Sequence, residues 1–121
     1  MVERMVSRIS IVMLGVRELA RSVAFYRDQV GFTLQHQTPG FAFLNAGPVT
    51  LCLSEALAKN KEHVAGATEI VLAVEHVRAA FVELQALGVE FLNEPRVVTG
   101  ASWAANFVDP DRHLLSVFGP E

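Results

Sequence analysis

The stretch that decides the fold is residues 16–32, VRELARSVAFYRDQVGF. Its apolar and aromatic side chains recur at the three- and four-residue spacing of a helix: Leu19, Val23, Tyr26 and Val30. Charged residues take the opposite side, and a glycine, the residue that commonly ends a helix, follows at Gly31. The segment therefore predicts an amphipathic helix that buries one side and ends at this glycine.

A second stretch, residues 74–89 (VEHVRAAFVELQALGV), repeats the pattern. Val74 of the second stretch matches Val16 of the first, and Gly88 matches Gly31. The two separations along the chain differ by a single position. A nearly fixed offset that carries the same order of apolar residues, helix and glycine indicates an internal duplication. Because neither half could cover both faces of its own sheet, we expect the halves to enclose a shared cleft, where a ligand would bind.

Short apolar or β-branched runs between turn residues predict the strands. The first half contains four such runs, at 9–14, 32–37, 41–44 and 49–53, and the second contains four more, at 69–74, 89–92, 103–108 and 114–118. Each half thus reads strand, helix, then three strands. We expect a single domain over 1–121, with a first module at about 7–54, a linker at about 55–67 and a second module at about 68–118.

Composition narrows the class of function. The formal net charge is −3 and the pI is near 5.8, which argues against nucleic acid or an anionic membrane as partner. The longest apolar run, 11–16, is too short to cross a bilayer, and the first eight residues mix both charge signs unlike a signal peptide. With one cysteine, Cys52, there is no disulfide framework, and a buried structural role is expected for it. We therefore expect a cytoplasmic protein.

Two segments carry a family resemblance. The pattern Ser-x-x-Phe-Tyr-x-Asp-x-x-Gly-Phe at 22–32 and the turn Phe-Val-Asp-Pro-Asp at 107–111 resemble the vicinal oxygen chelate superfamily. That superfamily includes glyoxalases, extradiol dioxygenases, and bleomycin- and fosfomycin-resistance proteins. The resemblance implies an α+β fold in which two βαβββ modules form a partly open, barrel-like mixed sheet around a central cleft, commonly in a homodimer.

The final turn departs from the family pattern. Arg112 stands where the family usually has Gly, and His113 stands where it usually has Asn. Glycine suits such a turn because the backbone there adopts a positive φ. We therefore expect a different turn geometry at this hairpin.

The metal ligands of the family can be carried over one position at a time. By resemblance they fall at Ile11, Thr50, Glu69 and Ser116, and only the glutamate could bind a divalent ion as a charged ligand. A divalent site generally needs three or more protein ligands of suitable type. The four histidines show no ligand spacing, and none of the serines lies in a nucleophile motif. We therefore predict no metal and no other cofactor.

The remaining cleft residues follow from alternation along the strands. We expect eight residues to line the ligand cleft: Ile11, Met13, Phe43, Thr50, Glu69, Val71, Trp103 and Ser116. Glu69 is the only candidate catalytic residue, and its alternative role is that of a solvated or paired residue at the strand end. Trp103 either stacks on a ligand or packs as a core or dimer-interface aromatic, and Phe43 faces the cleft or the interface.

Three functions follow. The first is a metal-independent small-molecule-binding protein that resembles the resistance members, which sequester a drug without chemistry. The second is a lyase, isomerase or dioxygenase of the superfamily with an atypical site around Glu69. The third is a regulatory or interaction domain whose cleft is filled by its own side chains. A small-molecule ligand and a homodimeric state are expected for the first.

Overall fold

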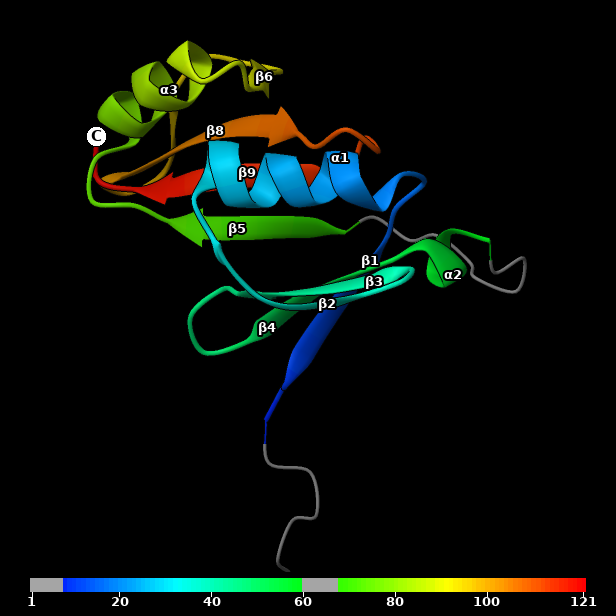
Figure 1. Ribbon diagram of the computed structural model, residues 1–121. Helices are drawn as coiled ribbons and strands as arrows, with labels where there is room; N and C mark the ends of the chain where they lie inside the picture. The colour runs from blue at the N-terminus through cyan, green and yellow to red at the C-terminus, as the bar shows by residue number, and fades with distance from the viewer. Residues whose placement is uncertain (1–7, 60–67) are drawn as a thin grey trace, which may run out of the picture.

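The computed structural model describes residues 8–59 and 68–121. Its elements fall into two modules, each with its own sheet (Figure 1). In Figure 1 the second sheet and the helix after its first strand occupy the upper half of the view, and the first sheet lies below them. The fold class predicted from the sequence is confirmed: the chain is a mixed α+β protein of two βαβββ modules, and its sheets do not close into a barrel.

The first module contains a single long helical segment and four strands. Its elements are β1 (Ile11–Gly15), α1 (Leu19–Ala24), the π-helical turn η1 (Phe25–Val30), β2 (Thr33–Thr38), β3 (Phe41–Asn45) and β4 (Thr50–Ser54). The sheet order is β1-β4-β3-β2, with β1 and β4 parallel and the other pairs antiparallel. A short helix, α2 (Glu55–Ala58), follows β4 inside the segment that the sequence predicts as a linker.

The second module repeats this order with one additional strand. Its elements are β5 (Glu69–Ala73), α3 (Val77–Ala86), β6 (Glu90–Phe91), β7 (Arg96–Thr99), β8 (Ser102–Val108) and β9 (Leu114–Gly119). The sheet order is β5-β9-β8-β6, and β7 also pairs with β8. The sequence prediction missed β7: Pro95 ends one extended segment, but the β-branched pair Val97 and Val98 then forms another against β8.

The π-helical turn explains why the offset between the modules is one position shorter after the helices than before them. In the first module the carbonyl of Tyr26 accepts the backbone amides of Gly31 and Phe32. In the second module the carbonyl of Leu84 accepts the amide of Val89, the residue after the equivalent glycine. Tyr26 and Leu84 are therefore equivalent positions, and η1 contains one inserted residue, as π-helical turns commonly do.

The core lies between the helices and the inner faces of both sheets. The first sheet contributes Leu14, Leu44, Leu51 and Leu53, and the second contributes Ala105, Phe107, Leu115 and Val117. Val23 and Tyr26 reach this core from the first helical segment. Because successive side chains of a strand point to opposite faces, the alternate residues of each sheet turn away from the core.

No helix in the described part of the chain is long and apolar enough to cross a membrane.

Candidate functional site

The side of each sheet that faces away from the core is here called its open face. The open face of the first sheet carries six side chains from all four strands: Ile11, Met13, His36, Phe43, Thr50 and Cys52. The ring of His36 stacks on that of Phe43, with centroids 6.1 Å apart. Burial raises the pKa of the Cys52 thiol, which therefore stays protonated and fills space, as the sequence predicts. This surface is mostly apolar.

The open face of the second sheet centres on Asn106 of β8. Its Nδ2 donates to Oε2 of Glu69 on β5 at 3.3 Å, and its Oδ1 accepts from Nη2 of Arg96 on β7 at 3.0 Å. Asn93, in the loop before β7, donates to the same Oδ1 at 3.1 Å, while its own Oδ1 accepts the backbone amide of Asn106 at 2.9 Å. Asn106 itself is only 8% exposed. Its amide is thus held in one orientation between a carboxylate and a guanidinium.

This network places charged groups of opposite sign at the two ends of one polar patch. Glu69 and Arg96 are both exposed, and within the described residues neither forms an ion pair with another side chain. A guanidinium carries five N–H donors, so Arg96 retains donors for an incoming acceptor. The patch, defined as Glu69, Asn93, Arg96 and Asn106, can therefore present both a donor and an acceptor group to a ligand.

The strand register shows how the four carried-over metal positions lie. Ile11 is paired with Thr50 in the first sheet. In the second sheet, however, Glu69 is paired with Leu114, and Ser116 lies two residues further on, opposite Val71. Within residues 8–59 and 68–121 no three His, Cys, Asp or Glu side chains gather to hold a metal ion. The donor set on these faces therefore does not fit the metal site that the resemblance implies.

Seven of the eight predicted cleft residues lie on the two open faces, and Trp103 does not. The indole shares the inner side of β8 with Ala105 and Phe107, and it packs against the core. The guanidinium of Arg78 on α3 covers the ring, 4.7 Å from its centroid. The geometry therefore matches the alternative role of a core aromatic, on the side opposite Glu69.

Asn106, Arg96 and Asn93 are not among the site residues that the sequence predicts. A signal for the first was present, because Asn106 is the one strongly polar side chain in the otherwise apolar run 103–108. Such a residue in a buried strand needs hydrogen-bond partners. Its partners, however, come from three other segments, and finding them requires the register of β5, β7 and β8.

A second polar group of residues joins the two modules and is here called the turn cluster: Tyr26, Asp109, Asp111 and His113. The hydroxyl of Tyr26 donates to Oδ2 of Asp109 at 2.7 Å, and Nδ1 of His113 lies 2.6 Å from the same oxygen. Oδ1 of Asp109 accepts the backbone amides of Asp111 and His113. The Asp109 side chain is fully buried. A buried carboxylate with four hydrogen-bond partners is well satisfied.

The titration of these groups follows from their contacts. Burial raises the pKa of Asp109, but the hydrogen bonds from His113 and Tyr26 outweigh it, and the net pKa lies below its ordinary value. The hydrogen bond with Asp109 raises the pKa of His113 against the opposing effect of burial. Burial and Asp109 raise the pKa of Tyr26 far above its ordinary value. The phenol therefore stays protonated and donates.

Asp111 extends the turn cluster to the start of the first helix. Its Oδ1 accepts the backbone amide of Arg17 at 3.1 Å and Nε of the same residue at 3.0 Å, and its Oδ2 accepts Oγ of Ser22 at 3.1 Å. The family pattern at 22–32 and the Asp-Pro-Asp turn are thus in direct contact. Their residues connect the modules rather than form the open faces.

The expected change of turn geometry at Arg112 is wrong. Arg112 has a φ of +70°, so it adopts the left-handed conformation that glycine would have taken. Its amide donates to the carbonyl of Asp109, and its guanidinium donates to Glu90. Because the buried carboxylate of Asp109 fixes the turn on both sides, the backbone keeps its shape even with a side chain at this position.

Comparison with known proteins adds sequence relatives. A family model described as "Glyoxalase/Bleomycin resistance protein/Dioxygenase superfamily" matches residues 8–117. A bleomycin resistance protein of Geobacillus stearothermophilus is 28% identical over 126 residues, covering 90% of this chain and 94% of that protein. A bleomycin resistance protein of Staphylococcus aureus matches with the same identity and coverage.

Solved structures share the fold. TnmS3, an antibiotic binding protein from Streptomyces sp. CB03234, has a TM-score of 0.80 at 22% identity, covering 98% of this chain and 100% of that chain. A lactoylglutathione lyase from Agrobacterium tumefaciens has a TM-score of 0.78 at 19% identity, covering 96% of each chain. One neighbour is thus a binding protein and the other an enzyme, so the fold alone does not separate these two functions.

Proposed function

We propose that this chain, which belongs to the glyoxalase/bleomycin resistance protein/dioxygenase superfamily, is a metal-independent small-molecule-binding protein that sequesters a drug or metabolite. The ligand binds on the open faces of the two sheets. The bleomycin resistance relatives and the antibiotic-binding neighbour support this class of ligand. Their ligands are not assigned to this chain, whose formal charge of only −3 is modest for sequestering a large cationic drug.

The observation that carries the proposal is the polar patch beside apolar side chains. Asn106 is buried and fixed by Glu69, Asn93 and Arg96, while Val71, on the same strand as Glu69, is 55% exposed. Ligand sites typically combine apolar walls with a few fixed polar groups that orient the ligand. Because the side chains of the patch hold one another in place, little ordering is needed when a ligand binds.

We further propose that the open faces are completed by a second copy of the chain. Ile11 and Met13 on the first open face are 47% and 43% exposed, and Val71 on the second is 55% exposed. Exposed apolar surface of this kind marks an interaction site. A homodimer that brings a first open face against a second would enclose the ligand between them. Analytical ultracentrifugation tests this, since a monomer at micromolar concentration contradicts the dimer.

The function is tested by a thermal-shift screen of organic compounds, bleomycin included, run with and without EDTA. A ligand that binds only the folded protein raises its melting temperature by mass action. We expect stabilisation that EDTA does not change and that Asn106→Ala reduces. The matched control is Gln85→Ala, an exposed residue of α3 outside both open faces. Stoichiometric nickel, zinc, iron or manganese in the purified protein, with EDTA-sensitive turnover, would contradict the proposal.

The second candidate function is an enzyme of the superfamily that uses Glu69 as a base. The observation that favours it is the hydrogen bond from Asn106, which orients the carboxylate on the open face. Assays for lyase, isomerase and dioxygenase turnover with the wild type and Glu69→Gln separate the two functions. Turnover lost in Glu69→Gln supports the enzyme, whereas ligand binding without turnover supports sequestration.

A further inference from the structure

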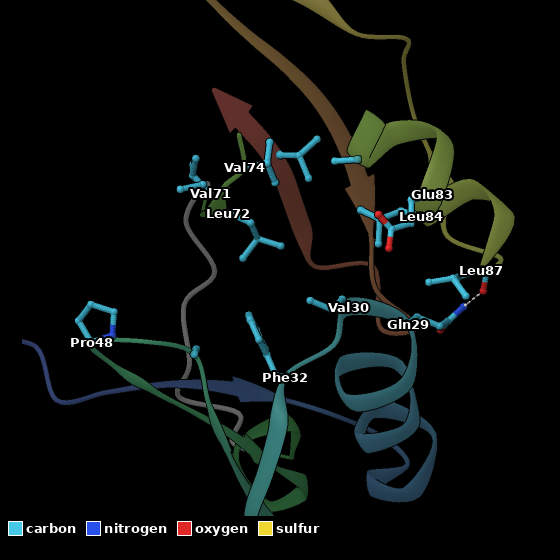
Figure 2. A pocket seen from close by; sticks show the side chains of 14 residues that line it. Gln29, Val30, Phe32, Pro48, Val71, Leu72, Val74, Glu83, Leu84 and Leu87 are labelled. Carbon is cyan, nitrogen blue, oxygen red and sulfur yellow. Dashed lines mark hydrogen bonds between the residues drawn. The ribbon is translucent and has the colours of Figure 1, made fainter. Parts of the chain in front are cut away.

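A pocket of about 540 Å³ lies between the modules, on the side where the helices pack (Figure 2). Phe32 and Pro48 of the first module line one side of it, and Leu72 of β5 and Val74, the residue after this strand, lie opposite. The third wall is the α3 side, where Glu83, Leu84 and Leu87 are drawn. Of the eight predicted cleft residues only Val71 reaches this pocket. The pocket therefore meets the second open face only along β5, at Val71 and Ala73, and does not include the polar patch.

The internal duplication shows what stands at the equivalent place elsewhere in the molecule. Tyr26 is equivalent to Leu84, as their carbonyl hydrogen bonds show, and Ser22 is equivalent to Ala80 by the same offset along the chain. The strand registers make Asp109, the residue after β8, equivalent to Ala46, the residue after β3. Ala46, Ala80 and Leu84 all line the pocket. The pocket thus corresponds to the turn cluster and the adjoining Ser22, with the phenol, the hydroxyl and the carboxylate replaced by smaller apolar groups.

We propose that this pocket is a second ligand site, which binds a compact aromatic group that carries a positive charge. At the equivalent place in the turn cluster the chain buries its own aromatic ring, that of Tyr26, which is 0% exposed. A ligand ring takes the corresponding space against Leu84, Val74 and Val117. A volume of about 540 Å³ falls within the usual range for small-molecule sites.

The polar groups of the lining select the charge. Among the described residues that form the pocket, Glu83 is the only charged side chain, and it is exposed to solvent. The side-chain amide of Gln29 already has a hydrogen-bond partner, because its Nε2 donates to the carbonyl of Leu87 at 2.9 Å (Figure 2). That hydrogen bond joins the two modules across the pocket wall and keeps the wall in place. A cationic group on the ligand therefore meets a carboxylate, while the ring meets apolar walls.

The proposal is tested with two probes, benzylammonium and benzyl alcohol, titrated into ¹⁵N-labelled protein and followed by amide chemical shifts. Both probes should shift the amides of residues 72–74 and 83–87, and benzylammonium should bind more tightly. Glu83→Gln should weaken benzylammonium about two- to fivefold, as expected for an exposed ion pair, and leave benzyl alcohol unchanged. Equal loss for the two probes would overturn the assigned charge preference.

The second test uses substitutions that fill the pocket. Ala80→Leu on the α3 wall and Ala46→Val on the opposite wall should each abolish binding of both probes. Two variants are used so that the test still stands if one of them fails to fold. Val82→Leu is the matched control, because Val82 is on the same helix, is 65% exposed and does not line the pocket. Probe binding that survives both filling variants overturns the site. The site is also overturned if a second copy of the chain occupies it. In that case the wild type binds neither probe, and Ala80→Leu dissociates a dimer that the wild type forms.

Discussion

The two junctions between the modules have the same backbone arrangement but different side chains: one is filled by polar, hydrogen-bonded groups, and the other is lined by apolar groups around a pocket. Where the first helical segment meets the β8–β9 turn, Tyr26 and Asp109 form a buried hydrogen-bonded pair, which the partly exposed His113 joins. Where α3 meets the β3–β4 turn, the equivalent positions are Leu84 and Ala46, and a pocket of about 540 Å³ is found. The duplicated backbone thus persists while the side chains diverge. One junction fastens the modules, which leaves the other available for a ligand.

The largest effect is expected from removing the central carboxylate of the turn cluster. Asp109→Ala should lower the free energy of unfolding by about 3–5 kcal/mol, because Tyr26, His113 and two backbone amides lose their acceptor in a buried place. Urea unfolding followed by circular dichroism measures it. The matched control is Asp28→Ala, whose carboxylate is exposed and, among the described residues, pairs with Arg27, and little or no change in stability is expected there. A loss below about 1 kcal/mol in Asp109→Ala would mean that the cluster does not fasten the modules.

The sequence carried enough information for the plan of the fold but not for this difference. The helical spacing at 16–32 and its repeat predicted both modules, and the family that it resembles is confirmed. Strand ends were predicted within a few residues; the last, for example, was expected at 114–118 and is observed at Leu114–Gly119. These features depend on local periodicity, which a single sequence displays directly.

The contents of the sites depend on contacts between distant residues, which local patterns do not display. Asn106 and Glu69 are 37 residues apart, and Tyr26 and Asp109 are 83 apart. Trp103 is predicted to line the cleft, but alternation with Phe107 along β8 puts its indole on the inner face. The contact of His113 with Asp109 likewise exists only when the turn is folded. Strand register and turn geometry determine these contacts, and local sequence patterns do not display either of them.

A smaller effect is expected from Tyr26→Phe, which keeps the ring and removes only the hydroxyl. The free energy of unfolding should fall by about 1–2 kcal/mol, because Asp109 loses one donor while the ring still stacks against Phe32. Urea unfolding again provides the measurement. In the Asp109→Ala background the same substitution should have less effect, since its partner is already gone. Equal losses in both backgrounds would show that the hydroxyl acts independently of Asp109.

The turn cluster should also make stability depend on pH. The pKa of His113 is raised in the folded state, so its contribution is complete below the ordinary histidine pKa and is lost as the pH rises through the raised value. The pKa of Asp109 is lowered, so its contribution is present above the ordinary aspartate pKa and is lost as the pH falls through the lowered value. The turn cluster therefore contributes most to stability at a pH between the ordinary pKa of aspartate and the ordinary pKa of histidine, in mildly acidic solution.

Urea midpoints measured from pH 5 to pH 9 test the histidine arm. The midpoint should fall as the pH rises, by less than Tyr26→Phe causes, because the His113 side chain is partly exposed, at 28%. His113→Gln should remove this dependence. His36→Gln is the control, because His36 is exposed on β2 and stacks on Phe43 away from the cluster. If the fall persists in His113→Gln and disappears in His36→Gln, then His36 of the first module causes the pH dependence, and the prediction for the turn cluster is wrong.

The smallest effect concerns the two turns that the helices meet. The β3–β4 turn contains Gly47 with a φ of +89°, whereas the β8–β9 turn contains Arg112 with a φ of +70°. A side chain in this conformation costs about 1 kcal/mol relative to glycine, and the exposed ion pair of Arg112 with Glu90 returns at most about as much. Arg112→Gly should therefore change the free energy of unfolding by less than about 1 kcal/mol. Arg112→Ala, which loses the ion pair and keeps the strained φ, should be about 1 kcal/mol less stable than Arg112→Gly in urea unfolding. Equal stability of these two variants would show that the turn relaxes out of the left-handed conformation once the arginine is removed.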